Sequence, residues 1–149
     1  MTEVPGNVYD WKTGDIEIGK KATGVGTALP GGTVVSETVG TGLWDEATDL
    51  DAGRIGVIPN LAQNGPNMNS DSDPTCNVLT GDGAEIYVVN TGGLVAGCRV
   101  AHAAGGTVKQ TTAGGFAVYV GKEGEGSGHK NPCTNAVTLA VVRIRMGLQ

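Results

Sequence analysis

The residues with the clearest chemical potential lie in the glycine-rich segment 121–130, GKEGEGSGHK, which follows a predicted strand. A phosphate-binding loop of the Walker type needs Gly-Lys-Ser or Gly-Lys-Thr leading into a helix, whereas Gly128 is followed by His129 and Lys130. The two glutamates of the segment would also repel a phosphate. Ser127 lacks the Gly-x-Ser-x-Gly frame of a hydrolase nucleophile. The segment therefore predicts neither nucleotide binding nor nucleophilic catalysis.

Metal-binding residue types occur in the chain, but not at the spacing of a metal site. His102 follows Cys98 by four residues, which in a strand places both on one face without giving a metal geometry, and His129 has no partner at a fixed spacing. The carboxylates cluster without EF-hand spacing, which favours a solvated acidic face. These carboxylates are Asp45, Glu46, Asp49 and Asp51, with Asp71 and Asp73 as a second group. We therefore expect a non-enzyme that needs no metal or other cofactor.

The three cysteines leave two interpretations open. Cys76 and Cys133 lie in similar proline-containing segments, PTCNVLT and PCTNAVT, so a disulfide between them is one alternative if the mature protein leaves the cell. In the other alternative all three cysteines stay reduced and act as small hydrophobic residues, as is usual in a cytosolic chain.

Composition narrows the classes of partner. The chain has 149 residues and a net charge of −5, and residues 1–60 carry four Lys or Arg against nine Asp or Glu. Because nucleic-acid binding needs clustered Lys and Arg, we expect no nucleic-acid partner. No apolar run is long enough for a transmembrane helix, and the N-terminus does not resemble a signal peptide. We therefore expect a soluble protein made in the cytoplasm, without a membrane partner.

The segment 84–121 organises the predicted fold. Its short runs of β-branched residues are separated by Gly92-Gly93, Gly105-Gly106 and Gly114-Gly115. Glycine pairs supply the positive φ that tight turns need, so the segment predicts a β-meander.

The rest of the chain adds further strand patterns, including a closing strand in which apolar residues alternate with two arginines. About eight to ten short strands with glycine turns predict an all-β fold, either a compact barrel or a sandwich. The predicted strands outside the meander are 15–20, 33–39, 54–58 and 136–146, with one short helix at 44–51 and polar loops at 59–82 and 121–135.

An internal repeat is also predicted. A shift of 61 residues aligns 31–59 with 92–120 without a gap and produces seven identities that keep glycines at turns and valines in strands. We therefore expect two tandem half-repeats, 31–89 and 92–146, within a single β domain that covers 15–149. The identities pair Gly31, Gly32, Val34, Val39, Ala52, Gly53 and Val57 with Gly92, Gly93, Val95, Val100, Ala113, Gly114 and Val118.

Residues 1–14, MTEVPGNVYDWKTG, are predicted to form an extended arm. Pro5-Gly6 and Gly14 interrupt regular structure, while Val4, Val8, Tyr9 and Trp11 are more apolar than a free tail requires. The arm either packs on its own domain as a first strand or docks on another chain. We favour the second alternative: the four apolar side chains contact a partner protein or a neighbouring copy, and not their own barrel.

The run GGLVAGCRVAHAAGGTVKQTTAGGFAVYVGKE, with the closing AVVRIRM, resembles the C-terminal part of the capsid decoration (cement) proteins of tailed bacteriophages. In that family a glycine turn, V-x-x-G-x-x-V, G-x-V, A-x-G and V-G precede a strand in which Val alternates with Arg. The corresponding positions here are Val95–Val100, which is one residue shorter than the first motif, and Gly106–Val108, Ala113–Gly115, Val118–Gly121 and Val142–Arg145. The resemblance covers about residues 84–147, and reaches the first half only through the repeat.

What the resemblance implies is a virion structural protein on the outer capsid surface. It implies a β-rich body bound across major capsid protein subunits, a homo-oligomer that is often a trimer, and an N-terminal arm that reaches onto the shell. Two other functions remain open: a glycan- or surface-binding β module, for which Trp44 is the one aromatic residue in a predicted surface segment of the body, and another phage structural subunit, of the tail tube or a head fibre.

Overall fold

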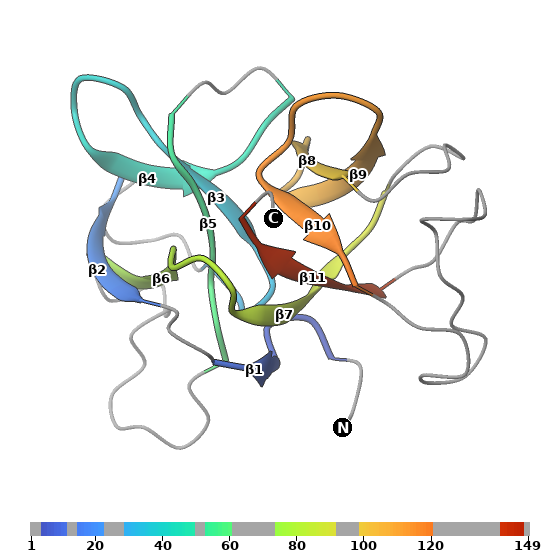
Figure 1. Ribbon diagram of the computed structural model, residues 1–149. Coiled ribbons are helices and arrows are strands. Elements are labelled where there is room, and N and C mark those ends of the chain that lie inside the picture. The colour runs from blue at the N-terminus through green and yellow to red at the C-terminus, as the bar shows by residue number, and fades with distance from the viewer. Residues whose placement is uncertain are drawn as a thin grey trace.

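The computed structural model describes residues 4–11, 15–22, 29–49, 53–60, 74–91, 99–120 and 141–147. These residues form eleven strands and no helix, which confirms the all-β prediction (Figure 1). None of them therefore forms a helix that could cross a membrane. The strands are β1 (Val8–Asp10), β2 (Ile16–Lys21), β3 (Val34–Glu37), β4 (Leu43–Glu46), β5 (Ile55–Val57), β6 (Thr75–Leu79), β7 (Glu85–Val89), β8 (Arg99–Ala103), β9 (Thr107–Thr111), β10 (Ala117–Tyr119) and β11 (Val141–Met146).

Five strands close into a barrel in the order β2-β4-β3-β5-β6. The β2–β4 pairing is parallel, and the other pairings of the barrel are antiparallel. Trp44 of β4 is almost completely buried, and it belongs to a separate core cluster of the barrel strands and their flanking segments. The cluster consists of Leu29, Val35, Trp44, Ile58, Cys76 and Val78.

Gly19 of β2 makes room for the indole ring, because a Cβ atom at this position would collide with Trp44. We expect Gly19→Ala to destabilise the protein by about 1–3 kcal/mol, the usual effect of overfilling a packed core. Chemical denaturation measures this difference. Trp44→Ala removes the indole ring that the new Cβ atom would meet, so the double variant should lose less stability than the sum of the two single variants. Strict additivity would show that the two side chains do not compete for space.

The other six strands form a sheet in the order β1-β7-β11-β10-β8-β9. This sheet and the barrel share one large hydrophobic core, which joins Val34, Val57 and Leu79 of the barrel to residues of the sheet such as Ile86 and Ile144. The β8–β9 turn anchors the sheet on the barrel: the Val34 N–H donates to the Gly106 carbonyl at 2.8 Å, and the Gly106 N–H donates to Ala47 at 3.2 Å. The two parts therefore form a single hydrophobic unit.

The two parts have the same strand connectivity. In the barrel, β2 pairs antiparallel with β6 and, at its C-terminal end, parallel with β4. In the sheet, β7 pairs antiparallel with β11, and Asn90 directly after it forms a parallel bridge with Val108 of β9. A matching hydrogen bond follows each parallel contact, from Ala22 N–H to Trp44 at 2.7 Å and from Thr91 N–H to Val108 at 2.9 Å. Strands β2–β6 thus correspond in order and pairing to β7–β11.

This correspondence bears on the repeat seen in the sequence. Segments 31–59 and 92–120 contain strands of the same order, β4-β3-β5 and β9-β8-β10. The boundary between the two halves differs, however. By strand pairing β7 is the first strand of the second half, whereas the predicted half-repeat 31–89 includes β7 as the last strand of the first half. An origin by duplication stays a prediction.

Three sequence predictions are wrong in detail. Segment 84–121 is not a simple meander, because β7 pairs with β1 and β11, and β10 crosses over to pair with β8. Residues 44–51 do not begin a helix: Leu43–Glu46 is a strand whose side chains alternate between the barrel core and the outside. The polar segment 59–82 is not a loop throughout, because it contains β6, which joins β2 to β5 in the barrel.

Candidate interaction surface

The N-terminal segment lies on the protein's own sheet. Strand β1 pairs antiparallel with β7, with Val8 opposite Ile86. Just before it, the Gly6 N–H donates to the Tyr87 carbonyl at 2.7 Å, and the Tyr87 N–H donates to the Asn7 carbonyl at 3.1 Å. Val8 also packs against the large core. These contacts hold residues 6–10 on β7, with β1 as the edge strand of the six-stranded sheet.

A second set of contacts holds the Pro5-Gly6 turn. The side-chain amide of Asn60 donates to the Pro5 carbonyl at 3.0 Å and to Asn7 Oδ1 at 2.9 Å, while the Asn60 N–H donates to the Gly6 carbonyl at 2.7 Å. Gly6 has a φ of 91° and approaches the backbone of Gly31 so closely that a Cβ atom would not fit. The dipeptide that interrupts regular structure in the sequence therefore makes a tight contact with the barrel.

Tyr9 covers a buried charge. Its ring lies edge-on to Tyr87, with 6.4 Å between ring centroids, and the Arg143 guanidinium carbon lies 3.9 Å from the Tyr9 centroid. Arg143 is almost completely buried, and its Nε lies 3.1 Å from Glu85 Oε1, while its Nη2 donates to the Val120 carbonyl at 3.1 Å. A cation next to an aromatic face is stabilised more strongly when it is desolvated. Tyr9 thus shields an ion pair that the sheet holds away from water.

The prediction that the arm does not lie on its own barrel domain is therefore wrong for residues 4–11. The alternative of a first strand is the one that the structure shows, because Tyr9, Gly6 and Val8 find partners on β7 and in the core. Residues 1–3 and 12–14 lie outside the described residues. Contact of the arm with a capsid or another copy stays a prediction. For residues 4–11 it can involve only the outer side of the segment, which faces away from the protein's own sheet.

That outer side is apolar. Val4, Tyr9 and Trp11 each expose about two fifths of their surface, at 41%, 44% and 42%, whereas Val8 is largely turned inward. Among the described residues, six large hydrophobic side chains are exposed, and five of them lie between residues 4 and 18: Val4, Tyr9, Trp11, Ile16 and Ile18; the sixth is Val39.

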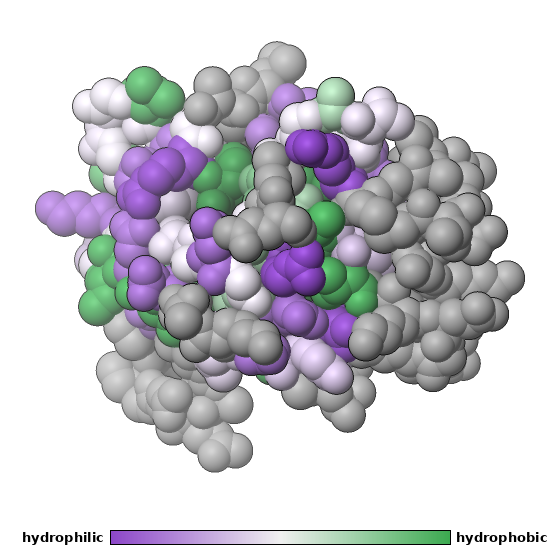
Figure 2. All heavy atoms as spheres, in the orientation of Figure 1, coloured by the Kyte–Doolittle hydropathy of each residue, from purple (hydrophilic) through white to green (hydrophobic). Residues whose placement is uncertain are grey.

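Strand β2 has the reverse of the usual polarity. Its sequence, IEIGKK, alternates apolar and charged residues at its start, yet Ile16 and Ile18 face outward and Ile18 is 69% exposed. Hydrophobic spheres are visible at the surface over β2 among hydrophilic ones (Figure 2). The opposite face of β2 meets the barrel core, where Gly19 lies against Trp44 and Lys21 is buried.

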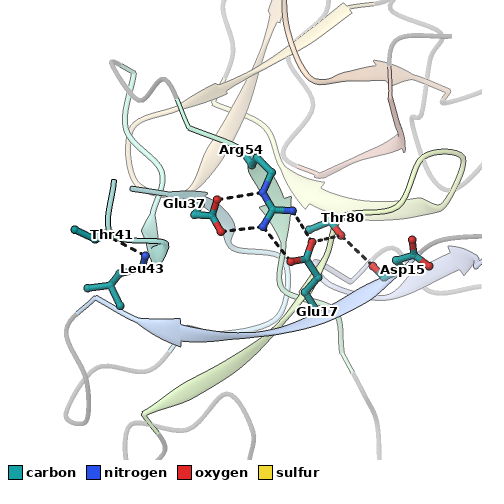
Figure 3. A network of polar contacts seen from close by, with 7 residues as sticks. All are labelled: Asp15, Glu17, Glu37, Thr41, Leu43, Arg54 and Thr80. Carbon is teal, nitrogen blue, oxygen red and sulfur yellow. Dashed lines mark hydrogen bonds and ion pairs between the residues drawn. The ribbon is translucent and has the colours of Figure 1, made fainter. Parts of the chain in front are cut away.

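A network of charged residues lies beside this core. Arg54 makes bidentate contacts with two carboxylates, at 2.7 and 3.0 Å to Glu17 and at 3.1 and 2.8 Å to Glu37 (Figure 3). Thr80 donates to Glu17 at 2.9 Å, and the Arg54 guanidinium lies 5.4 Å from the Trp44 ring. The network therefore links β2, β3, and the segments that precede β5 and follow β6.

Hydrogen bonds from Arg54 lower the pKa of Glu17 and of Glu37 below the ordinary value of 4.5, and the bonds from Glu37 and Glu17 raise the pKa of Arg54. Because the two carboxyl pKa values are depressed in the folded state, the stabilisation is present above pH 4.5 and is lost as pH falls through the depressed values. Both pairs are partly solvated, so the contribution is modest.

We expect the melting temperature of the wild-type protein to fall more steeply below pH 4.5 than that of Arg54→Met, in which no guanidinium depresses these pKa values. Thermal melts between pH 7 and pH 3 measure the difference. Arg54→Lys serves as the matched control, because it keeps the charge without the bidentate geometry, and its profile should lie between the other two. Parallel profiles for all three proteins would contradict a role of the network in acid stability.

The other candidate residues do not converge. Asp45 and Glu46 lie on β4, and Asp49 contacts Lys109 at 3.2 Å, while Asp51, Asp71 and Asp73 lie outside the described residues. His102 lies on β8 with its ring 6.5 Å from that of Phe116. Within the described ranges, no three His, Cys, Asp or Glu side chains are grouped as metal ligands would be.

The remaining predictions concern the cysteines and the glycine-rich segment. Cys76 lies on β6 and is buried in the barrel cluster, not in a loop. Cys133, Cys98 and the whole of 121–130 lie outside the described residues, so pairing of Cys76 with Cys133 stays a prediction.

Sequence reasoning missed Ile16, Ile18 and the Arg54 network. The alternating pattern of β2 was visible, but alternation alone does not say which face is buried. A signal was present in Gly19, since a glycine within a strand often marks the close approach of another group.

Comparison with known proteins identified no relative: no family model matches the chain, and no curated protein matches it either.

Proposed function

We propose that this protein is a virion structural protein that decorates an assembled capsid and stabilises it by binding across major capsid protein subunits. The single observation that carries the proposal is the concentration of exposed hydrophobic side chains in the first 18 residues, on a chain whose core is otherwise well packed. Exposed apolar groups of this kind mark a surface that is covered in an assembly.

Two further features support the proposal. The sequence resembles tailed-phage decoration proteins over residues 84–147, and the all-β fold agrees with the β-rich body that the resemblance implies. In the proposal, copies assemble as a homo-oligomer, with a trimer as the state that the resemblance favours. The contact with the shell involves the outer side of the seated N-terminal segment, at Val4, Tyr9 and Trp11, and many copies make a weak contact collectively strong.

The alternative of a glycan-binding module loses its candidate residue. Trp44 is only 2% exposed and packs inside the barrel, so it presents no surface to a sugar ring.

Co-sedimentation with capsid shells that lack this protein tests the proposal. We expect saturable binding of the full-length chain and a several-fold loss of affinity for Trp11→Ala, because truncation of a partly exposed aromatic residue removes apolar contact area. Val39→Ala is the matched control, since it removes an exposed apolar side chain from the β3–β4 turn, which lies far from β1 (Figure 1). Absence of binding by the wild-type protein would contradict the proposed function.

A further inference from the structure

We propose that the open edge of β2 at Ile16–Ile18 binds an extended segment of a partner protein, which adds to the barrel as a further strand. The inference rests on the proposed function, because the partner is taken to be a capsid subunit. It concerns a different surface from the N-terminal segment, and the internal correspondence between β2–β6 and β7–β11 leads to it.

Among the described residues, the backbone of β2 is paired along its length on one side and only at its C-terminal end on the other. Hydrogen bonds from Thr80 N–H to the Asp15 carbonyl and from Lys21 N–H to the Pro74 carbonyl place the odd-numbered residues of β2 toward β6. Ile16 and Ile18 therefore direct their N–H and C=O groups to the opposite side. There β4 pairs only with Lys20 and Lys21, and no described residue bonds to the backbone of Ile16 or Ile18.

The corresponding side of β7, which faces away from β11, binds an extended segment of the chain. Bonds such as Met146 N–H to the Ala84 carbonyl turn the even-numbered residues of β7 toward β11, so that Tyr87 directs its backbone groups away from β11. The hydrogen bond from Ala22 N–H in the barrel corresponds to the bond from Thr91 N–H in the sheet. Counted back from these two bonds, Ile18 and Tyr87 occupy the same position in their strands. The Tyr87 N–H and C=O bond to Asn7 and Gly6 of the N-terminal segment, which fills the space before the bridge to β9.

The side chains at the two edges differ in burial in the same way as the backbones differ in pairing. Tyr87, whose edge is occupied and whose ring is met by Tyr9, is 1% exposed, whereas Ile18 is 69% exposed. A strand edge with free backbone groups and outward isoleucines is a template for strand addition. Natural edges are protected by outward charges. On the outward face of β2 the nearest charge is that of Lys20, which lies where β2 already pairs with β4, and Glu17 bonds to Arg54 and Thr80 on the other face.

These features define the occupant. It is an extended polypeptide that pairs with Ile16 and Ile18 through its backbone and places an apolar or aromatic side chain on Ile18, as residues 6–10 do on β7. The occupant does not need an aromatic ring to cover a cation, since the position opposite Ile18 is Asn77, whereas the position opposite Tyr87 is Arg143, which Tyr9 covers.

Two variants test the site on capsid shells that lack this protein. Ile18→Lys places a charge on the open edge, as natural edge strands do, and Val39→Lys makes the same change at a turn outside it. We expect Ile18→Lys to weaken co-sedimentation at least about tenfold, and Val39→Lys to bind as the wild type does. Both side chains are largely exposed, so both variants should melt near the wild-type temperature.

Amide hydrogen exchange gives the site-specific readout. In the isolated protein the Ile18 amide should exchange fast and the Tyr87 amide slowly, and on the shell the Ile18 amide should become protected. If the wild type does not bind shells, the proposed function fails and this inference falls with it. If the wild type binds while Ile18→Lys binds equally well and Ile18 stays unprotected, the inference alone is overturned. Protection of Ile18 in the isolated protein together with a dimer in sedimentation would also overturn it, because a second copy would then occupy the edge.

Discussion

Removal of residues 1–11 is expected to destabilise the whole protein by about 3 kcal/mol or more, because it takes away an edge strand, the core contact of Val8 and the aromatic cover of Arg143. The remaining chain would expose the Tyr87 backbone groups and let water reach the Arg143–Glu85 pair. Chemical denaturation and thermal melts of the truncated and full-length proteins measure the effect.

Two controls isolate the cause. Removal of residues 1–3 alone leaves the seated segment 4–11 intact and should preserve the stability of the full-length protein. Tyr9→Ala keeps the strand but removes the ring over Arg143, and should produce part of the loss. A truncated protein with unchanged melting behaviour would show that the segment is a detachable arm.

This outcome also decides how capsid-binding data are interpreted. A truncated chain that is partly unfolded loses binding for reasons unrelated to contact with a shell. Point changes such as Trp11→Ala, at an exposed position outside β1, therefore test the contact more directly than truncation does.

Much of the fold followed from residue types. Short runs rich in β-branched residues predicted strands at 15–20, 33–39, 54–58 and 136–146, and each range overlaps a strand of the structure. The Gly105-Gly106 pair predicted a tight hairpin, and both glycines have positive φ between β8 and β9. Local patterns of this kind depend on neighbours in the sequence, which a single chain displays directly.

What failed depended on distant contacts. A short helix was predicted at 44–51, yet pairing with β3 and burial of Trp44 impose a strand on its first residues. The N-terminal segment binds to the backbone of Tyr87, about 80 residues away, and nothing near Pro5-Gly6 in the sequence predicts this contact. The polarity of β2 could not be assigned, because a shift of one residue exchanges its two faces.

The candidate surface, too, was predictable where it depends on residue type and not where it depends on distant contacts. Val4, Tyr9 and Trp11 were identified from their apolar character, and the structure leaves each of them exposed in part. Their attachment to the protein's own sheet was not predicted, and neither was the open edge of β2, since both are properties of strand pairing.

The buried ion pair should be the most sensitive polar contact of the sheet. Glu85→Ala leaves the Arg143 guanidinium, which is 4% exposed, without its carboxylate, and we expect a loss of about 3–5 kcal/mol in unfolding free energy. Arg143→Met should be milder, because it removes the buried charge and fills the space under Tyr9 with an apolar chain. Arg99→Met on β8 is the control, since Arg99 is exposed and should change stability by less than about 1 kcal/mol. Urea denaturation of the three variants measures the order. If Glu85→Ala is no more destabilising than Arg99→Met, the guanidinium finds water or other acceptors once Glu85 is gone, and the ring of Tyr9 does not seal the site.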